Sequence, residues 1–240
     1  MKKEVLKVLS NEKLTETIFE MRLSGSSPML PGQFVELLIP GFSLRRPFSV
    51  AEYDKGILTI IYKVMGRGTE EMTTIKKNTK IDTLTGLGRG FSLSGSEHPL
   101  LIGGGIGIAP LIYLARVLYE REKSVKILLC GRCNNDLIKQ EEIGKYGEVF
   151  FATDDGSCGF KGNALEAAQS LFKQTDHYYA CGPMPMLKAL ATNNKKGELS
   201  LEAHMGCGFG ACMGCSIQTT DGPKRVCKEG PVFQAGEVIF

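Results

Sequence analysis

Four cysteines near the C-terminus constrain the fold of this chain more than any other feature. They follow the pattern Cys207-x4-Cys212-x2-Cys215-x11-Cys227, and its first two intervals are the plant-type spacing for a [2Fe-2S] cluster. A binuclear cluster needs four thiolates, of which one tight loop can supply three and a neighbouring strand or turn the fourth. The sequence therefore predicts a C-terminal loop wrapped around an iron-sulfur cluster.

A structural zinc site and a set of inert free thiols are the competing interpretations. Zinc also binds four cysteines, typically as two closely spaced pairs, whereas here three cysteines crowd together and the fourth stands apart. Three glycines and an alanine lie between the first three cysteines. They let backbone amides turn inward and donate to the cluster sulfurs, so the pattern favours iron and sulfur over zinc.

Composition excludes several classes of protein. Hydrophobic residues make up 42% and charged residues 23% of the chain, which is typical of a globular protein. The net charge of +3 is too small to indicate a nucleic-acid or anionic-membrane partner. The longest uncharged stretch, 99–115, is interrupted by glycines and is shorter than the roughly 18 residues of a spanning helix. With no apolar signal segment visible near the N-terminus, we expect a cytoplasmic chain whose cysteines serve metal or redox chemistry.

Three parts of the chain differ in their sequence rhythm. Residues 1–96 contain short strand-like runs, which predict an antiparallel sandwich or barrel, with a short helix after Gly68 that Thr69 would cap. Residues 97–195 alternate strands with helices, which predicts a parallel sheet. Residues 196–240 form the glycine- and cysteine-rich tail, with strand-like pieces at 216–219 and 236–240. In the middle part we expect strands at 99–102, 125–129, 148–151 and 177–180, and helices at 110–122, 164–172 and 184–191.

A glycine turn follows the first of these parallel strands. Its glycines would present backbone N–H groups and a helix N-terminus to a phosphate, although Ile108 stands where a G-x-G-x-x-G motif has its third glycine. Alone it could be an ordinary strand-to-helix turn. Two other strands end in polar or glycine-rich turns at the same sheet edge, which together indicate a dinucleotide crevice. The candidate residues are Gly103, Gly104, Gly105, Gly107, Asp155, Gly182 and Pro183.

Two segments of the first part could hold a flavin. Arg46 begins the sequence Arg46-Pro47-Phe48-Ser49, in which the arginine could neutralise a pyrophosphate and the serine hydroxyl could approach a flavin ring. Gly68-Thr69, at a helix start, is a second candidate phosphate site. A basic strand on a solvated face is the alternative for the first segment.

These motifs, taken in order, resemble those of the ferredoxin–NADP reductase superfamily. Over essentially the whole chain, the sequence looks like the electron transfer subunits of dihydroorotate dehydrogenase B in bacterial pyrimidine synthesis, and Cys-Gly-Phe-Gly-Ala-Cys-x-Gly-Cys is the most specific piece. The resemblance implies an N-terminal antiparallel flavin barrel (1–96), a central parallel α/β nucleotide-binding domain (97–195) and a small [2Fe-2S] subdomain (196–240).

The resemblance also assigns roles to residues. It implies that Cys207, Cys212, Cys215 and Cys227 bind the cluster and that Cys181 lies near the nicotinamide. NAD is implied as the nucleotide, although the segment from Arg132 to Asp136 permits NAD or NADP. FAD contacts are implied at Arg46, Pro47, Phe48, Ser49, Ile61, Tyr62, Lys63, Gly68 and Thr69.

The same resemblance implies a relay that works with a separate FMN-containing dihydroorotate dehydrogenase catalytic subunit, two copies of each chain. Electrons would pass from dihydroorotate through the partner's FMN, the cluster and FAD to NAD⁺. His204 departs from the arginine that relatives often carry there, and Glu202 could contact the partner or the flavin edge. Two rival functions remain: a reductase subunit of another complex, of the sulfite reductase or hydrogenase type, and a zinc-stabilised, non-catalytic nucleotide-binding regulator.

Overall fold

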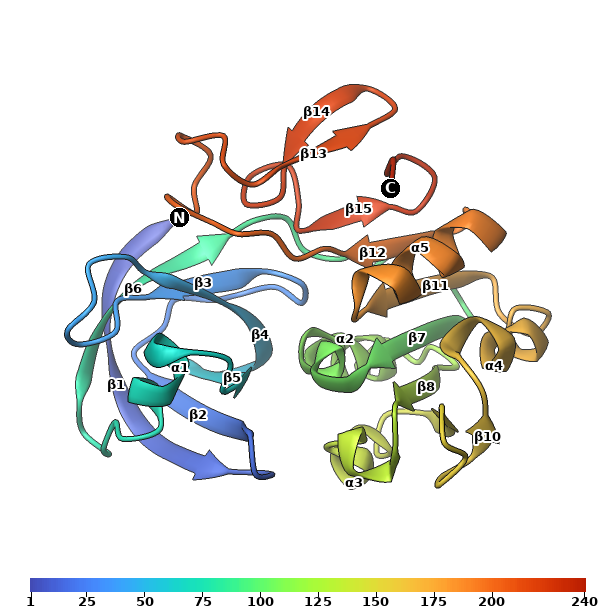
Figure 1. Ribbon diagram of the computed structural model, residues 1–240, viewed down its shortest axis with the longest axis horizontal. Coiled ribbons are helices and arrows are strands. Elements are labelled where there is room, and N and C mark those ends of the chain that lie inside the picture. The colour runs from blue at the N-terminus through green and yellow to red at the C-terminus, as the bar shows by residue number, and fades with distance from the viewer.

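Six antiparallel strands of the N-terminal part close into a barrel in the computed structural model, which describes residues 1–240 (Figure 1). Their order around the barrel is β1-β2-β5-β4-β3-β6. Every second residue of the last strand is buried, as expected where one sheet face forms a core. The elements are β1 (Lys2–Lys13), β2 (Ile18–Ser24), β3 (Phe34–Leu37), β4 (Arg46–Asp54), β5 (Ile57–Lys63), α1 (Arg67–Met72) and β6 (Lys80–Leu87).

The hairpin between β4 and β5 shows how sequence sets this register. Asp54 pairs with Ile57, so only Lys55 and Gly56 form the loop, and both have positive φ, 44° and 83°. Such a two-residue turn matches the right-handed twist of the strands. The turn aligns the end of β4 with the start of β5. The predicted flavin motif lies at the other end of β4.

A seven-stranded sheet forms the second part, in the order β10-β9-β8-β7-β11-β12-β15. All neighbouring strands are parallel except for the last pair. Strand order reverses between β7 and β11, and a parallel sheet binds ligands at such a point. The strands are β7 (Pro99–Gly104), β8 (Lys126–Gly131), β9 (Glu148–Thr153), β10 (Phe160–Lys161), β11 (His177–Cys181), β12 (Gly197–Ser200) and β15 (Val232–Gln234).

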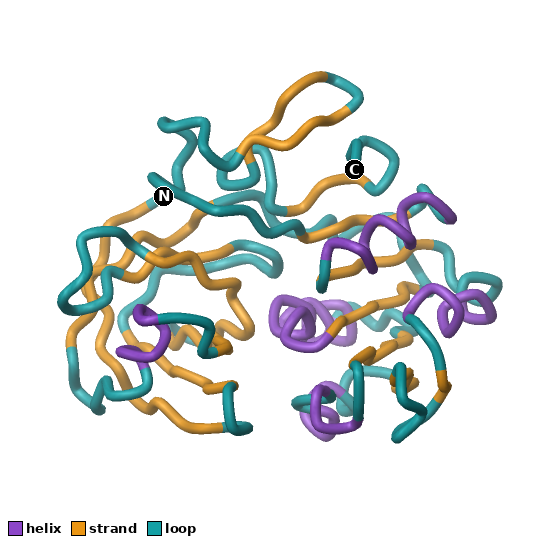
Figure 2. The backbone as a smooth tube through the Cα atoms, in the orientation of Figure 1, coloured by secondary structure: helices purple, strands orange, loops and turns teal.

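Helices cover both faces of this sheet, and Figure 2 shows that all but α1 lie in this half of the molecule. Leu101 packs with α2 on one face, whereas Leu100 and Ile102 pack with α4 and α5 on the other, as alternation along a strand requires. The helices are α2 (Ala109–Glu120), α3 (Gln140–Ile143), α4 (Ala164–Leu171) and α5 (Met184–Asn193), with short 3-10 helices η1 (Gly105–Ile108) and η2 (Asn134–Asp136).

The cysteine-rich segment lies above both larger parts in Figure 1, between β12 and β15. It carries the hairpin β13 (Ser216–Thr219) and β14 (Gly222–Arg225). Cys215 and Cys227 belong to the same hydrophobic cluster as Phe34 of the barrel and Leu199 of the sheet. The segment is therefore packed against both neighbours.

The predicted fold class is confirmed, with three local differences. Helix α1 begins at Arg67, and Thr69 is its third residue rather than its cap. Residues 236–240 form no strand; β15 lies earlier and pairs with β12. Because both strands belong to the large sheet, the predicted cluster subdomain contributes to the nucleotide-binding part, and the boundary at 195/196 stays a prediction. None of the helices combines the length and the apolar character needed to span a membrane.

Candidate functional site

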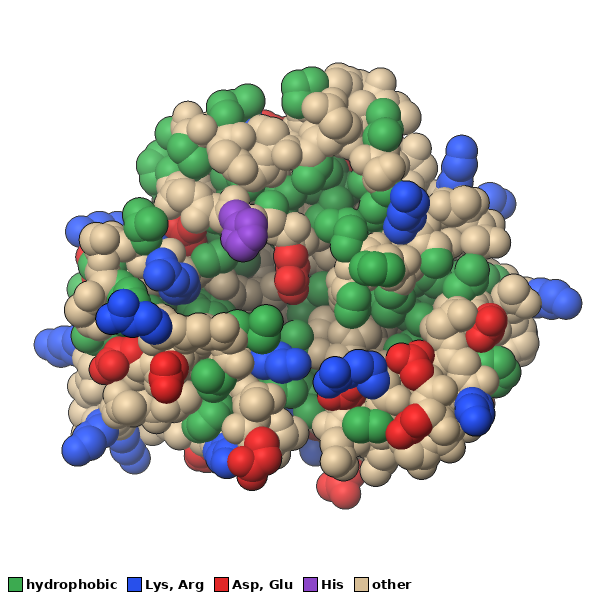
Figure 3. Space-filling model, viewed as in Figure 1, with side chains coloured by type: hydrophobic (Ala, Val, Ile, Leu, Met, Phe, Trp, Pro, Cys, Tyr) green, Lys and Arg blue, Asp and Glu red, His purple; other side chains and the backbone are tan.

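A cavity of about 840 Å³ opens between the barrel and the parallel sheet. Figure 3 shows this face hollowed between the two halves, with hydrophobic side chains on one border and charged side chains below. The lining comes from both halves, because Ile18 and Lys63 of the barrel face the turns after the sheet strands. The predicted residues on its wall are Lys63, Gly104, Gly105, Gly107, Gly182 and Pro183.

The glycine turn and the turn after β11 are packed directly against each other. A Cβ at Gly107 would collide with the carbonyl of Cys181, and one at Gly104 would lie 2.8 Å from Pro183 Cδ. Gly105 is different, because its φ is +55° and a Cβ there would meet nothing within 4 Å. Its backbone borders open space, as a phosphate-binding turn needs.

Three predicted nucleotide residues do not line the cavity. Gly103 packs against Ile108, with a distance of 2.7 Å from its ideal Cβ to Ile108 Cδ1. Asp155 is turned to its own loop, where its carboxylate accepts hydrogen bonds from Ser157 N (2.9 Å) and Ser157 Oγ (2.6 Å). Asp154 lines the cavity in its place.

Cys181 is the third predicted nucleotide residue that does not line the cavity. Its thiol is buried in the hydrophobic cluster that packs α2 against the sheet, and burial raises its pKa to about 12. Cys181 is thus a neutral, packed thiol, and the structure places only its backbone against the turn that borders the cavity.

The two candidate FAD phosphate sites lie side by side. An ideal Cβ on Gly68 would be 3.2 Å from Arg46 Nε. Thr69 Oγ1 accepts hydrogen bonds from Met65 N (2.9 Å) and Gly66 N (3.2 Å), which fixes the loop before α1. A guanidinium next to a tight helix start is a suitable site for a pyrophosphate.

In β5, the strand predicted to run along the flavin, Ile61 and Tyr62 are buried, and Lys63 is partly exposed. The Tyr62 ring is 1% exposed, and its hydroxyl donates to Asn11 Oδ1 at 2.9 Å inside the barrel. Ile61 is buried on the opposite side, toward the nucleotide domain. Only Lys63 of the three lines the cavity, so a contact from Tyr62 to a bound flavin would use its backbone. Pro47, Phe48 and Ser49 on neighbouring β4 are half-buried.

The four C-terminal cysteines form two pairs. Cys207 Sγ accepts hydrogen bonds from Ala211 N (3.2 Å) and Cys212 N (3.4 Å), and Cys215 Sγ accepts one from Cys227 N (3.4 Å). Burial opposes ionisation of Cys207, but these inward-pointing amides outweigh it and lower its pKa to about 6. A loop that favours a thiolate is suited to binding a metal.

The donor set fits an iron-sulfur cluster. The Cys207 side chain lies within hydrogen-bond reach of that of Cys212, and the Cys227 side chain within reach of that of Cys215. Four thiols in two adjacent pairs are the donor set of a binuclear cluster. Arg225, two residues before the last cysteine, braces the loop because its Nη1 donates to Gly210 O at 2.5 Å and its other nitrogens bind Glu229.

A buried acid lies between the loop and the barrel. Glu36 is 1% exposed, and neither carboxylate oxygen has a hydrogen-bond partner. Burial, and then the negative charge of a Cys207 thiolate, raise its pKa to about 7. In β3 it pairs with Pro47 of the predicted FAD motif, so it joins the candidate flavin strand to the candidate cluster loop.

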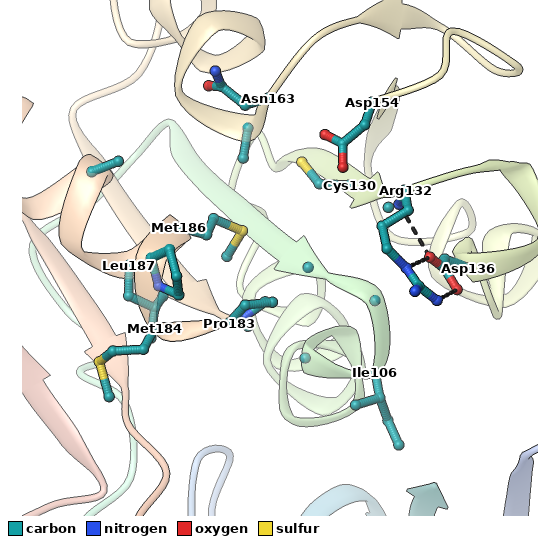
Figure 4. Close-up of a pocket in the computed structure, with 18 of the residues that line it drawn as sticks. Ile106, Cys130, Arg132, Asp136, Asp154, Asn163, Pro183, Met184, Met186 and Leu187 are labelled. Carbon is teal, nitrogen blue, oxygen red and sulfur yellow. Dashed lines mark hydrogen bonds and ion pairs between the residues drawn. The ribbon is translucent and has the colours of Figure 1, made fainter.

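Several lining residues were not assigned as nucleotide contacts, although the sequence pointed to the segment from Arg132 to Asp136 and to Glu202 as candidates. Arg132, Asp136 and Asp154 gather at one end of the cavity in Figure 4, and Met184 and Met186 lie at the other. The position of the polar residues at the ends of β8 and β9 was the available signal. Glu202 also lines the cavity, and burial raises its pKa.

Comparisons with known proteins agree with this geometry. The sequence profile of the iron-sulfur cluster binding domain of dihydroorotate dehydrogenase B matches residues 202–239, and that of the oxidoreductase NAD-binding domain matches residues 101–192. The chain is 38% identical to a dihydroorotate dehydrogenase B (NAD⁺) electron transfer subunit of Fusobacterium nucleatum, covering 99% of each chain. It is also 38% identical to the Streptococcus pneumoniae protein of that name, covering 99% and 98%.

Solved structures show the same architecture. One chain of an NADH-dependent reduced ferredoxin-NADP oxidoreductase superposes with a TM-score of 0.90 at 28% identity, covering 98% of this chain and 90% of that one. A Neisseria gonorrhoeae ferredoxin NADP⁺ reductase with bound FAD and NADP has a TM-score of 0.67 at 16% identity, covering 79% and 89%. The latter likeness concerns the fold alone.

Proposed function

Because this chain belongs to the family of dihydroorotate dehydrogenase B (NAD⁺) electron transfer subunits, we propose that it carries electrons from a dihydroorotate-oxidising partner to NAD⁺. The partner in this proposal is a separate FMN-containing catalytic subunit, and the complex holds two copies of each chain. In this proposal the complex works in the cytoplasm, and its reaction belongs to pyrimidine synthesis.

The chemistry requires a converter between two kinds of carrier. A nicotinamide exchanges a hydride and an iron-sulfur cluster exchanges single electrons, while a flavin can do both. We assign FAD to the strands around Arg46–Ser49 and Ile61–Lys63, with its pyrophosphate beside Arg46 and Gly68. The nicotinamide nucleotide belongs to the cavity, and the cluster belongs to the two cysteine pairs.

The protein's own task is to hold these groups close together and away from water. The observation that carries the proposal is the shared packing of Cys215 and Cys227 with Phe34 of β3. This packing supports a position of the cysteine loop on the outside of the barrel, beside the strand that bears the predicted FAD motif. Cys212 and Phe209 of this loop face solvent. Electrons that enter there from the partner would have a short transfer path to the flavin.

Reconstitution with the catalytic partner tests this proposal. The purified complex should form NADH from dihydroorotate and NAD⁺, and the isolated chain should reduce an artificial acceptor with NADH. Cys212→Ser, at an exposed position, should abolish the first reaction and leave the second. A colourless chain that contains zinc, or a chain that supports neither reaction, would contradict the proposal. Light scattering of the complex measures the copy number.

A further inference from the structure

The end of the cavity beyond β8 carries an ion pair built into a tight turn (Figure 4). Asp136 Oδ2 accepts hydrogen bonds from Arg132 Nε (3.0 Å) and Arg132 N (3.1 Å), and its Oδ1 lies 3.4 Å from Arg132 Nη2. The Asp136 side chain is 24% exposed, and the Arg132 side chain is 78% exposed. The carboxylate therefore fixes both the backbone and the guanidinium of the residue that follows the strand.

The surrounding backbone holds this pair in place. Gly131 brings the turn back on itself, because a Cβ there would lie 2.8 Å from Asp136 Cβ. Asn134 N donates to Ser157 Oγ (2.8 Å), and Asp154 N donates to Gly131 O (3.1 Å). The turns after β8 and β9 are thereby tied together, and they present two carboxylates, those of Asp136 and Asp154, to one cavity.

The position of the Arg132–Asp136 pair indicates which part of a bound nucleotide it would contact. It follows the second strand of the parallel sheet, where the adenosine ribose of a dinucleotide lies. An acid there accepts a hydrogen bond from a free ribose 2′-hydroxyl, whereas an arginine there accommodates a 2′-phosphate. This chain has both residues, and its sequence alone favours neither nucleotide. In the structure the arginine is already paired with the acid.

We propose that Asp136 selects NAD(H) over NADP(H), by accepting the ribose 2′-hydroxyl and by holding Arg132 away from the role of a phosphate ligand. A 2′-phosphate would have to displace the Asp136 carboxylate from Arg132 and would meet Asp154 close by. Like charges placed together are a common means of excluding the wrong ligand. The other cation of this region is Lys63, which reaches the cavity from the barrel. This inference rests on the proposed function, which places a nicotinamide nucleotide in the cavity.

The test compares the two nucleotides in holoprotein variants, with an artificial acceptor. Asp136→Asn should raise the ratio of kcat/KM for NADPH to that for NADH by at least about tenfold, which equals about 1.4 kcal/mol. Arg132→Gln added to Asp136→Asn should cancel the gain. Calorimetry with 2′,5′-ADP and ADP provides a readout that is independent of turnover, and the affinity ratio should shift in the same direction. Asp136→Ser serves as a second variant in case the asparagine disturbs the turn.

Asp221→Asn is the matched control, since Asp221 pairs with Lys224 on the β13–β14 hairpin, outside the cavity. It should leave both ratios unchanged. The inference is overturned if Asp136→Asn and Asp136→Ser keep the wild-type ratios, or if the gain persists without Arg132. A wild-type holoprotein that oxidises neither nucleotide and binds neither ADP analogue would overturn the proposed function itself, and this inference with it.

Discussion

The carboxylate of Glu36 in the barrel lies directly against the backbone of Gly208 in the cysteine loop. Gly208 has a φ of +72°, and any Cβ there would overlap the Glu36 carboxyl group. One contact thus joins the strand beside the predicted FAD motif to the loop that begins at Cys207. It explains why the loop needs glycine at this position for two separate reasons, conformation and space.

Gly208→Ala should displace the loop and reduce cluster incorporation. The change combines an unfavourable backbone conformation, which costs about 1–2 kcal/mol, with a collision against a buried side chain. Iron analysis of the purified chain measures the effect. Gly214→Ala is the matched control, because its Cβ would be 3.6 Å from Cys212 Sγ, an ordinary contact. Equal iron content in the two variants would contradict the role of the Glu36 contact.

Glu36→Gln should stabilise the protein at pH 8.5 more than at pH 5. Burial raises the pKa of Glu36 from 4.5 to about 7, so the folded state prefers the neutral acid. The neutral acid therefore adds to the free energy of unfolding of the wild-type protein below about pH 4.5, and this contribution is lost as the pH rises through 7. The difference corresponds to at most about 3 kcal/mol. Urea denaturation at both pH values measures it.

Glu198→Gln is a suitable comparison for that experiment. Glu198 is also buried, but its carboxylate accepts hydrogen bonds from Ser92 N (2.9 Å) and Gln234 Nε2 (3.0 Å). Its replacement should destabilise the protein at both pH values, because a satisfied acceptor is lost. If Glu36→Gln is equally destabilising, the unpartnered state of Glu36 is not a property of the protein in solution.

Arg116→Gln should weaken the contact between the barrel and the nucleotide-binding part. Arg116 of α2 binds Glu52 of β4 through Nη2 (2.7 Å) and Nε (3.0 Å), and it also donates to Tyr53 O (2.8 Å). Removing it leaves the largely buried Glu52 carboxylate without its cation and with Tyr53 N as its remaining donor (2.7 Å), at a cost of about 2 kcal/mol. Thermal unfolding should show an earlier transition than for Lys126→Gln, which breaks a more exposed pair with Glu148. Coincident transitions would contradict this.

Two glycines of the turn after β7 should separate folding from nucleotide binding. Gly107→Ala collides with the Cys181 carbonyl, so it should lower the unfolding temperature and abolish NADH oxidation. Gly105→Ala places its methyl group in open space at the cavity wall and adds only the backbone strain of a φ of +55°. It should raise the KM for NADH several-fold and lower the unfolding temperature less than Gly107→Ala. If both variants unfold alike, the turn has only a packing role.

The sequence predicted those features that depend on short-range rules. Cysteine spacing indicated the loop, and the alternation of strands with helices in residues 97–195 indicated the parallel sheet. It could not reveal that the cysteines fall into two pairs, because this depends on how β14 returns to the loop. It also placed a strand at 236–240, where an apolar run was visible, although the pairing partner of β12 is the shorter segment Val232–Gln234.

Within the site, the missing information was the direction in which side chains point. Asp154 and Asp155 are adjacent and chemically alike, yet only the first lines the cavity, because Ser157 binds the second. Cys181 follows a sheet strand as expected, but its side chain points into the core. Such distinctions follow from tertiary packing, which sequence patterns do not encode.

Anaerobic titration of the purified chain with NADH, followed by electron paramagnetic resonance and visible absorption, tests the central claim most directly. We predict a chain with about two irons per FAD, in which NADH bleaches the flavin and produces the signal of a reduced [2Fe-2S] cluster. Flavin bleaching with no cluster signal, from a chain that contains its iron, would contradict a relay within this polypeptide.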